Sequence, residues 1–212
     1  MYKNGYGNIA NKDKVINYLE VAFAKNPGPW LLKAWQMGQV AEKMSKDLGL
    51  DPDLAFASAS LASLGQAYDK GLKANLFAYD LLRADSYFFL ARIAITHTFP
   101  IKSISSYWGE VNLSEKEIAF IESFLYKYDY NDYDYLSQYL YFLIDGSSKE
   151  LGNLENLDKN SLLSDEVKTR IYQLDEYFTS KLANNLYEYK AKIKRSKFPY
   201  RLFTKEELEN FS

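Results

Sequence analysis

The fold is decided by one stretch of the chain, residues 48–71, which reads LGLDPDLAFASASLASLGQAYDKG. Gly49 ends one helix, Asp51 is a favoured N-cap residue, and Pro52 occupies the first helical position, where its missing N–H costs nothing. The helix that follows carries small and apolar residues on nearly every side. Such a helix is buried all round, so we predict that it lies at the centre of the protein.

Apolar residues recur at helical spacing along most of the remaining chain, and this pattern predicts an all-α fold. Capping boxes at residues 114–117 and 204–207 each mark the start of a helix. We find no convincing β-hairpin and no internal repeat. Besides the central helix and the two capped helices, helices are predicted over residues 12–25, 30–48, 73–83, 86–96 and 132–144, and from Ser164 to about Lys194.

Composition limits the classes of function. The chain has 212 residues, 47% of them hydrophobic and 25% charged, which is typical of one soluble domain. A net charge of −2 provides no global attraction to nucleic acid or to an anionic membrane. The absence of cysteine excludes a disulfide, a thiolate nucleophile and a cysteine-ligated zinc. No apolar signal segment is present at the N-terminus, so we expect a cytoplasmic location.

Three pieces of the chain carry a family resemblance. They are residues 26–30 (NPGPW), 48–65, and 96–102 (THTFPIK). In this order and with these gaps, residues 27–143 resemble the core of the HD-domain metal-dependent phosphohydrolases. The resemblance implies a single domain with an orthogonal helical bundle as its core. Outside that core, composition predicts a loose Gly- and Asn-rich arm over residues 1–11 and a loop over 145–160, and residues 161–212 are predicted to form a C-terminal helical extension.

The resemblance does not carry the family's metal ligands with it. That family binds a divalent metal through a first His, a His-Asp pair, further His residues and a last Asp. One late His is retained as His97, but a single imidazole cannot form an imidazole–carboxylate site. We therefore predict no catalytic residue, metal or cofactor. The other family positions fall on Lys33, Ala62, Ser63, Ala74 and Tyr141.

Three functions remain open, and the third is a nucleic-acid-associated protein that uses the basic residues Lys190 to Lys197. The first is a pseudoenzyme that acts as a protein-interaction or small-ligand-sensing module. The alternative is a divergent metal-dependent phosphohydrolase, acting on a nucleotide or small phosphate ester through ligands placed elsewhere. For a phosphate-like ligand, the candidate residues of the vestigial cleft are Lys33, Ser63, Arg92, His97, Lys102 and Tyr141.

Lys33 and His97 each allow two interpretations. Lys33 could take over the electrostatic role of the metal, with Asp69 and Asp80 as neighbours, or its ammonium could extend to the surface. His97 could be a general acid–base group, or it could hydrogen-bond a carbonyl at its helix end and complement the helix dipole. Ser63 has no nearby His in sequence, and its simpler interpretation is a small residue in the core.

Two segments could contact partners. The tyrosine-rich run from Tyr126 to Tyr141 is typical either of a protein or homodimer interface or of core packing. Acidic residues interleave with these tyrosines, which makes nucleic acid an unlikely partner for the run. The basic residues from Lys190 to Lys197 could bind an acidic partner or nucleic acid, but cations at a helix C-terminus are favoured by the dipole alone.

Overall fold

The computed structural model describes residues 1–145, 154–186 and 188–189. Helices dominate this part of the chain, so the prediction of an all-α protein is confirmed. The elements are β1 (Tyr2–Lys3), β2 (Gly7–Asn8), α1 (Lys12–Lys25), α2 (Pro29–Leu48), α3 (Pro52–Leu61), η1 (Leu64–Ala67), α4 (Gly71–Ala84), α5 (Phe88–Thr96), η2 (Ile104–Ser106), α6 (Glu115–Lys127), α7 (Asp132–Leu143), α8 (Leu154–Lys159) and α9 (Asp165–Thr179).

Helix α3 is the central helix, as the sequence predicts. Asp51 caps its N-terminus by accepting the backbone N–H of Leu54 at 3.0 Å. From Leu54 to the end of the helix every side chain is buried. Helix α2 packs closely along it, because a Cβ at Gly38 would lie 1.8 Å from Ser60 Oγ. The small residues of both helices therefore allow the two backbones to approach.

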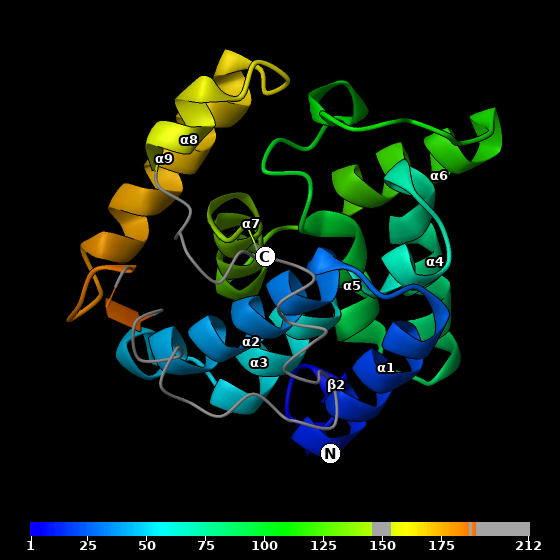
Figure 1. The fold of residues 1–212 in the computed structure, drawn as a ribbon, viewed down its shortest axis with the longest axis horizontal. Coiled ribbons are helices and arrows are strands. Elements are labelled where there is room, and N and C mark those ends of the chain that lie inside the picture. Colours follow the sequence, from blue (N-terminus) through cyan, green and yellow to red (C-terminus); the bar gives the residue numbers. More distant parts are fainter. Residues whose placement is uncertain (146–153, 187, 190–212) are drawn as a thin grey trace.

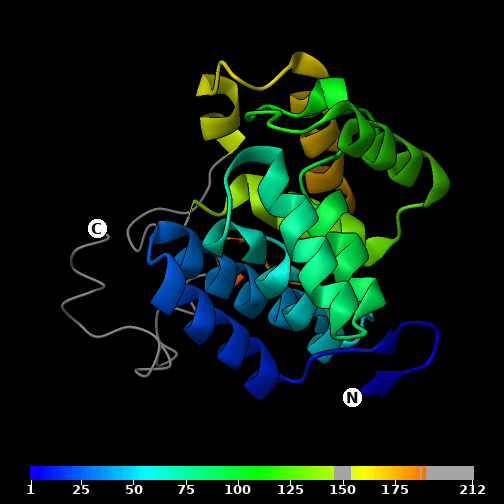
Figure 2. The same cartoon turned by 90° about the vertical axis from the view of Figure 1, so that its right-hand side faces the viewer.

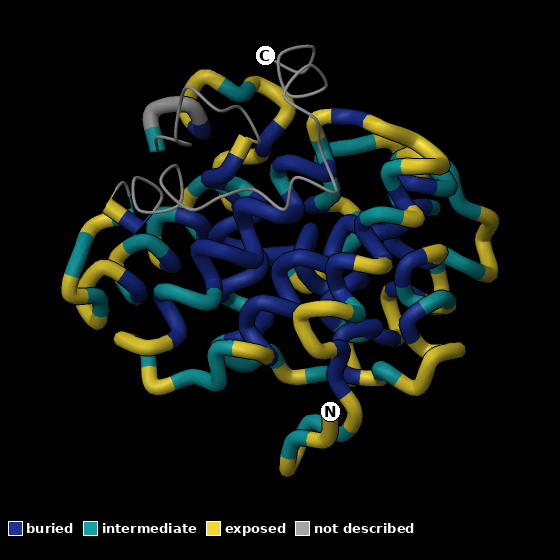
Figure 3. The backbone as a smooth tube through the Cα atoms, turned by 60° about the horizontal axis from the view of Figure 1, so that its bottom comes forward, coloured by how far each residue is buried: buried dark blue, intermediate teal, exposed yellow. Residues whose placement is uncertain are grey.

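The other helices surround this pair. Figure 1 shows α2 and α3 across the middle of the molecule, with α7 beside them. Helices α4 and α5 pack against each other on one side, and α8 and α9 pack against α7 on the other. Figure 2 shows α1 lying along the outside of the bundle. In Figure 3 the buried backbone forms one continuous centre, and the exposed residues lie at the periphery.

A second, smaller apolar cluster holds α6 in place. Glu117 Oε2 accepts the backbone N–H and the hydroxyl of Ser114, each at 2.8 Å, and this capping box opens the helix as predicted. The buried face of α6 then packs against α4 and against the end of α5. The cluster consists of Leu72, Leu76, Ile95, Phe99, Ile121, Phe124 and Leu125.

The N-terminal segment differs from the prediction. Residues 1–11 were expected to form a loose arm without a hairpin, but β1 and β2 pair antiparallel. Lys3 Nζ lies 2.5 Å from Asp51 Oδ2, at the start of α3, and Ile9 is fully buried. The expectation of a loose arm is therefore wrong. Strands of two residues are too short to produce an alternating pattern that the sequence could reveal.

Two further boundaries differ. The loop predicted over residues 145–160 contains α8 in its second half. The helix that begins after Ser164 ends at Thr179, well before Lys194, with Ser180 as its C-cap. The basic residues Lys190 to Lys197, the second capping box and the rest of the predicted C-terminal extension from residue 190 onward lie outside the described residues. Within the described part of the chain, no helix combines the length and the apolar character that crossing a membrane requires.

Candidate ligand-binding site

Four of the six candidate cleft residues meet in one cluster. Ser63 Oγ lies 3.3 Å from His97 Nε2, and the ring of Tyr141 meets the His97 ring edge to face at 4.8 Å. The ammonium of Lys33 lies 4.0 Å from the centre of the Tyr141 ring. The four residues come from α2, the turn after α3, the C-cap of α5, and α7. Segments that are far apart in sequence thus meet at one point.

His97 has a structural role in this cluster. Its Nδ1 lies 3.2 Å from the carbonyl oxygen of Ile93 and 3.0 Å from that of Ala94. Because carbonyl oxygens only accept, Nδ1 carries the proton, and Nε2 accepts the hydroxyl of Ser63. Burial lowers the pKa of His97 to about 3. The predicted hydrogen bond to a carbonyl at the helix end is present, but the ring is neutral at pH 7 and does not complement the helix dipole.

Lys33 neither extends freely into solvent nor pairs with the expected carboxylates. Its side chain is partly buried, and this desolvation lowers the pKa of Lys33 to about 8, opposed by attraction to Asp145. Among the described residues no carboxylate lies within 4.0 Å of its ammonium. Asp69 and Asp80, the neighbours predicted from sequence, are not its partners. The Tyr141 ring is its closest partner.

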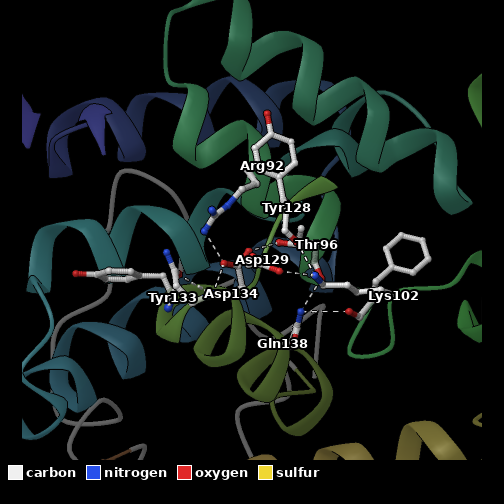
Figure 4. A network of polar contacts seen from close by, with 10 residues as sticks. Arg92, Thr96, Lys102, Tyr128, Asp129, Tyr133, Asp134 and Gln138 are labelled. Atoms are coloured by element: carbon white, nitrogen blue, oxygen red, sulfur yellow. Dashed lines mark hydrogen bonds and ion pairs between the residues drawn. The ribbon is translucent and has the colours of Figure 1, made fainter. Parts of the chain in front are cut away.

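Arg92 and Lys102 are engaged by other groups. Arg92 Nη2 lies 2.5 Å from Asp134 Oδ2, and Asp134 is fully buried and also accepts the hydroxyl of Thr96 at 2.7 Å. Lys102 Nζ donates to the carbonyl of Tyr128 at 2.7 Å and approaches Asp129. Figure 4 shows this network joining α5 to the start of α7. Both cations thus serve the fold.

The donors at the family's metal positions do not fit a divalent metal. Lys33 presents an ammonium there, Ala62 and Ala74 present methyl groups, and Ser63 presents a hydroxyl that His97 already binds. The phenol of Tyr141 has its pKa raised by burial, so it is protonated and a poor ligand. In the portion of the chain that the structure describes, no three His, Asp or Glu side chains gather as a metal site would require.

A pocket of about 380 Å³ opens beside the cluster, and Tyr141 belongs to both. We call it the Tyr141 pocket. Its volume lies within the range of small-molecule sites. The walls combine aromatic rings with amides and charged groups, and Ala74, one of the positions that the resemblance assigns to a metal ligand, lines the pocket as well. The lining residues are Asn26, Trp30, Gln66, Asp69, Lys70, Gly71, Ala74, Asn75, Tyr107, Trp108, Gly109, Glu110 and Tyr141.

One wall is fixed to the N-terminus of α4. The N–H of Leu72 donates to the carbonyl of Glu110 at 2.9 Å, and the N–H of Lys73 donates to Asn112 Oδ1 at 3.0 Å. Gly71 allows this approach, because it has φ +55° and a Cβ there would lie 2.4 Å from the Glu110 carbonyl oxygen. The loop that carries Tyr107 and Trp108 is therefore held in position before any ligand binds.

A second part of the lining is fixed by the end of α1. The Nδ2 of Asn26 donates to the carbonyl of Gln66 at 2.8 Å, which ties the C-cap of α1 to η1. The indole N–H of Trp30 donates to the carbonyl of Asn26 at 3.1 Å. Both parts of the lining are thus preorganised by the fold.

Sequence reasoning did not select Trp30, Tyr107, Trp108 and Glu110 as site residues. Trp30 was noticed only as part of the segment that resembles the HD family. The signal for the others was two adjacent aromatic residues followed by Gly in a stretch with no helical pattern, which is typical of a functional loop. Nothing in the local sequence indicates that this loop reaches α4 and Tyr141.

The tyrosine-rich run is mostly engaged inside the protein. Tyr133, Tyr139 and Tyr141 are buried, and Tyr130 donates its hydroxyl to the carbonyl of Phe99 at 2.8 Å. Tyr126, by contrast, is 89% exposed. These positions favour core packing over a tyrosine-rich interface.

Comparison with known proteins adds no assignment. A scan of protein-family models, a search of curated proteins and a search of solved structures each returned no match. The function must therefore be argued from the residues of this chain.

Proposed function

We propose that this chain is a catalytically inactive, HD-domain-like protein that senses a small ligand in the Tyr141 pocket. One observation carries the proposal. At three positions that the resemblance assigns to metal ligands, Ser63 bonds His97, whose ring contacts Tyr141, and Tyr141 in turn contacts Lys33, while a pocket large enough for a small molecule remains beside them.

The cluster supports a non-catalytic role because its groups already satisfy one another. Ser63 and His97 share a hydrogen bond, and the single ring proton of neutral His97 is already donated to the carbonyls of Ile93 and Ala94. The ammonium of Lys33 stands over a ring, where a metal would need carboxylates or imidazoles. The cation that this part of the protein holds is therefore its own lysine.

The pocket supports ligand binding because its walls are fixed without a ligand. A preformed site loses less conformational entropy on binding than a mobile one. The Tyr141 ring also joins the pocket to α7, the helix that α8 and α9 contact. A ligand that displaces this ring would shift α7, which supports a sensing role over simple storage.

A thermal-shift screen of chelator-treated protein tests the proposal. The panel contains small cationic, neutral and anionic compounds, each tested on the wild type, on Trp108→Ala, and on Phe120→Ala as a surface control. A compound that binds only the folded state at a hundred times its Kd adds about 2.7 kcal/mol, or roughly 5–10 °C in Tm. We expect at least one compound to stabilise the wild type and Phe120→Ala but not Trp108→Ala.

The alternative phosphohydrolase is tested on the same samples. Release of p-nitrophenol from p-nitrophenyl phosphate is followed with and without Mn²⁺. We expect no metal-dependent release. Metal-dependent hydrolysis by the wild type would contradict the proposal and favour the divergent enzyme.

A further inference from the structure

The walls of the Tyr141 pocket are rich in aromatic rings. The centre of the Trp108 ring lies 6.5 Å from that of Tyr107, with 30° between their planes, and 6.5 Å from that of Tyr141, with 38° between them. Trp30 lines the same pocket. The faces of such rings are electron-rich and attract cations, and Trp attracts them most strongly.

The fold already places a cation on one of these rings. The ammonium of Lys33 lies 4.0 Å from the centre of the Tyr141 ring, within the range of a cation–π interaction. Among the described residues no carboxylate lies within 4.0 Å of this ammonium. The Tyr141 ring thus contacts a positive charge directly, and Asp145 attracts the same ammonium from farther away.

The charged residues of the pocket also favour a cation. Asp69 and Glu110 line it, against the single ammonium of Lys70. Neither carboxylate forms an ion pair within the described residues. Burial and the nearby charge of Glu110 together raise the pKa of Tyr107 to about 12, so Glu110 acts electrostatically on the aromatic wall. The formal charge of the lining is thus negative, although the ammonium of Lys33, which contacts Tyr141 from outside the lining, offsets part of it.

An anion would find few donors here. The helix α2 begins at Pro29, which has no N–H, and the N–H groups of Leu72 and Lys73 at the start of α4 are already paired with Glu110 and Asn112. The helix N-termini near the pocket therefore offer little of the N–H array that binds phosphate elsewhere. The other cations expected from sequence, in α5 and in the segment after it, are bound by carboxylates.

We propose that the Tyr141 pocket takes a small organic ammonium ion, with its charge against the aromatic faces of Trp108 and Tyr141 and balanced by Asp69 and Glu110. This assignment rests on the proposed ligand-binding function and adds the chemical class of the ligand. The ammonium group would be a protonated or methylated amine, since a hydrated metal ion cannot exploit ring faces in this way.

A matched pair of probes tests the assignment. Choline and its neutral carbon analogue, 3,3-dimethylbutan-1-ol, have nearly the same shape and differ in charge. Each is titrated into the full chain and followed by calorimetry and by tryptophan fluorescence, with inorganic phosphate as the anionic probe. We expect saturable choline binding at least tenfold tighter than binding of the neutral analogue, and no binding of phosphate.

Variants locate the site. The double substitution Asp69→Asn with Glu110→Gln should weaken choline binding about tenfold, and Trp108→Ala should abolish it. Glu122→Gln, an exposed carboxylate on α6, should leave it unchanged. Thermal unfolding of each variant confirms that it is folded before its affinity is compared.

The outcomes separate this inference from the proposed function. Equal binding of choline and its neutral analogue, binding of phosphate at Trp108, or no choline binding would overturn the ammonium assignment. If other panel compounds still bind in a manner that depends on Trp108, the proposed ligand-binding function stands. If no compound does, both fail.

Discussion

The ammonium of Lys33 lies 4.0 Å from the centre of the Tyr141 ring, and this contact joins α2 to α7 at the two positions that the HD-domain resemblance assigns to the first and last metal ligands. A cation on a lysine is covalently attached and does not dissociate as a metal ion does, so it holds this position without a metal. Its cost is desolvation, because burial lowers the pKa of Lys33 to about 8.

Replacing Lys33 tests that cost. The folded state binds this proton more weakly than the unfolded chain, whose lysine has the ordinary pKa of 10.5. The unfolded state therefore holds more protons between about pH 8 and 10.5, and the stability contributed by Lys33 rises with pH across that window. We expect the free energy of unfolding of Lys33→Met to be about 1–3 kcal/mol larger than that of the wild type at pH 7. We also expect the variant to lack the increase in stability between about pH 8 and 10.5. Urea unfolding at pH 7, 9 and 10.5 measures both, with Lys70→Met as the exposed control.

The contribution of His97 to stability depends on pH in the acidic range, whereas that of Lys33 does so in the alkaline range. His97 is the one histidine of the chain, and its folded pKa of about 3 lies below the ordinary 6.5. The contribution of the neutral His97 ring to the free energy of unfolding is complete above pH 6.5. It decreases by about 1.4 kcal/mol per pH unit as the pH falls toward 3. Wild-type protein should thus lose about 2 kcal/mol between pH 7 and 5. Unfolding of His97→Gln across the same range should show a much smaller slope, and an unchanged slope would contradict the buried neutral ring.

The two cations engaged outside the cluster differ in importance. Asp134 is fully buried against Arg92, so Asp134→Ala leaves a buried guanidinium unpaired and should cost about 3–5 kcal/mol. Asp129, the partner of Lys102, is fully exposed, and Asp129→Ala should leave stability unchanged within error. Chemical unfolding of both variants makes the comparison. A similar loss for both would show that burial does not decide the strength of these pairs.

Substitutions of Trp108 distinguish the contribution of its aromatic ring from that of its indole N–H. Its indole nitrogen is enclosed and has no hydrogen-bond partner among the described residues. Removing an unpaired buried donor costs nothing in hydrogen bonding, so Trp108→Phe should keep the stability of the wild type within about 1 kcal/mol. Choline binding should be weakened less by Trp108→Phe than by Trp108→Ala. Loss of folding in Trp108→Phe would reveal a partner for the N–H that the structure does not show.

Local rules predicted most of the helices. The N-cap at Asp51 and the capping box at Ser114 lie next to the residues that they organise, and their helices begin where predicted. The N-terminal hairpin was not predicted, because its pairing spans only two residues in each strand. The end of α9 at Thr179 was not predicted, because no proline or glycine marks it in the sequence.

The site was harder to predict than the fold. Ser63 and His97 are 34 residues apart, and no local pattern indicates that they bond. Their meeting with Lys33 and Tyr141 was expected through the family resemblance, not through spacing. Arg92 could not be distinguished from a ligand-binding cation, because its partner Asp134 lies 42 residues away. The aromatic wall at Tyr107 and Trp108 depends on a loop anchored to α4, which is a tertiary contact.

A calorimetric titration of Mn²⁺ into chelator-treated protein tests the central claim most directly, with His97→Gln measured alongside the wild type. The account predicts no saturable binding at the cluster, because Lys33, Ser63 and Tyr141 offer an ammonium, an engaged hydroxyl and a protonated phenol. Saturable binding that the His97→Gln variant loses would contradict it, since the metal site of the family would then survive in this chain.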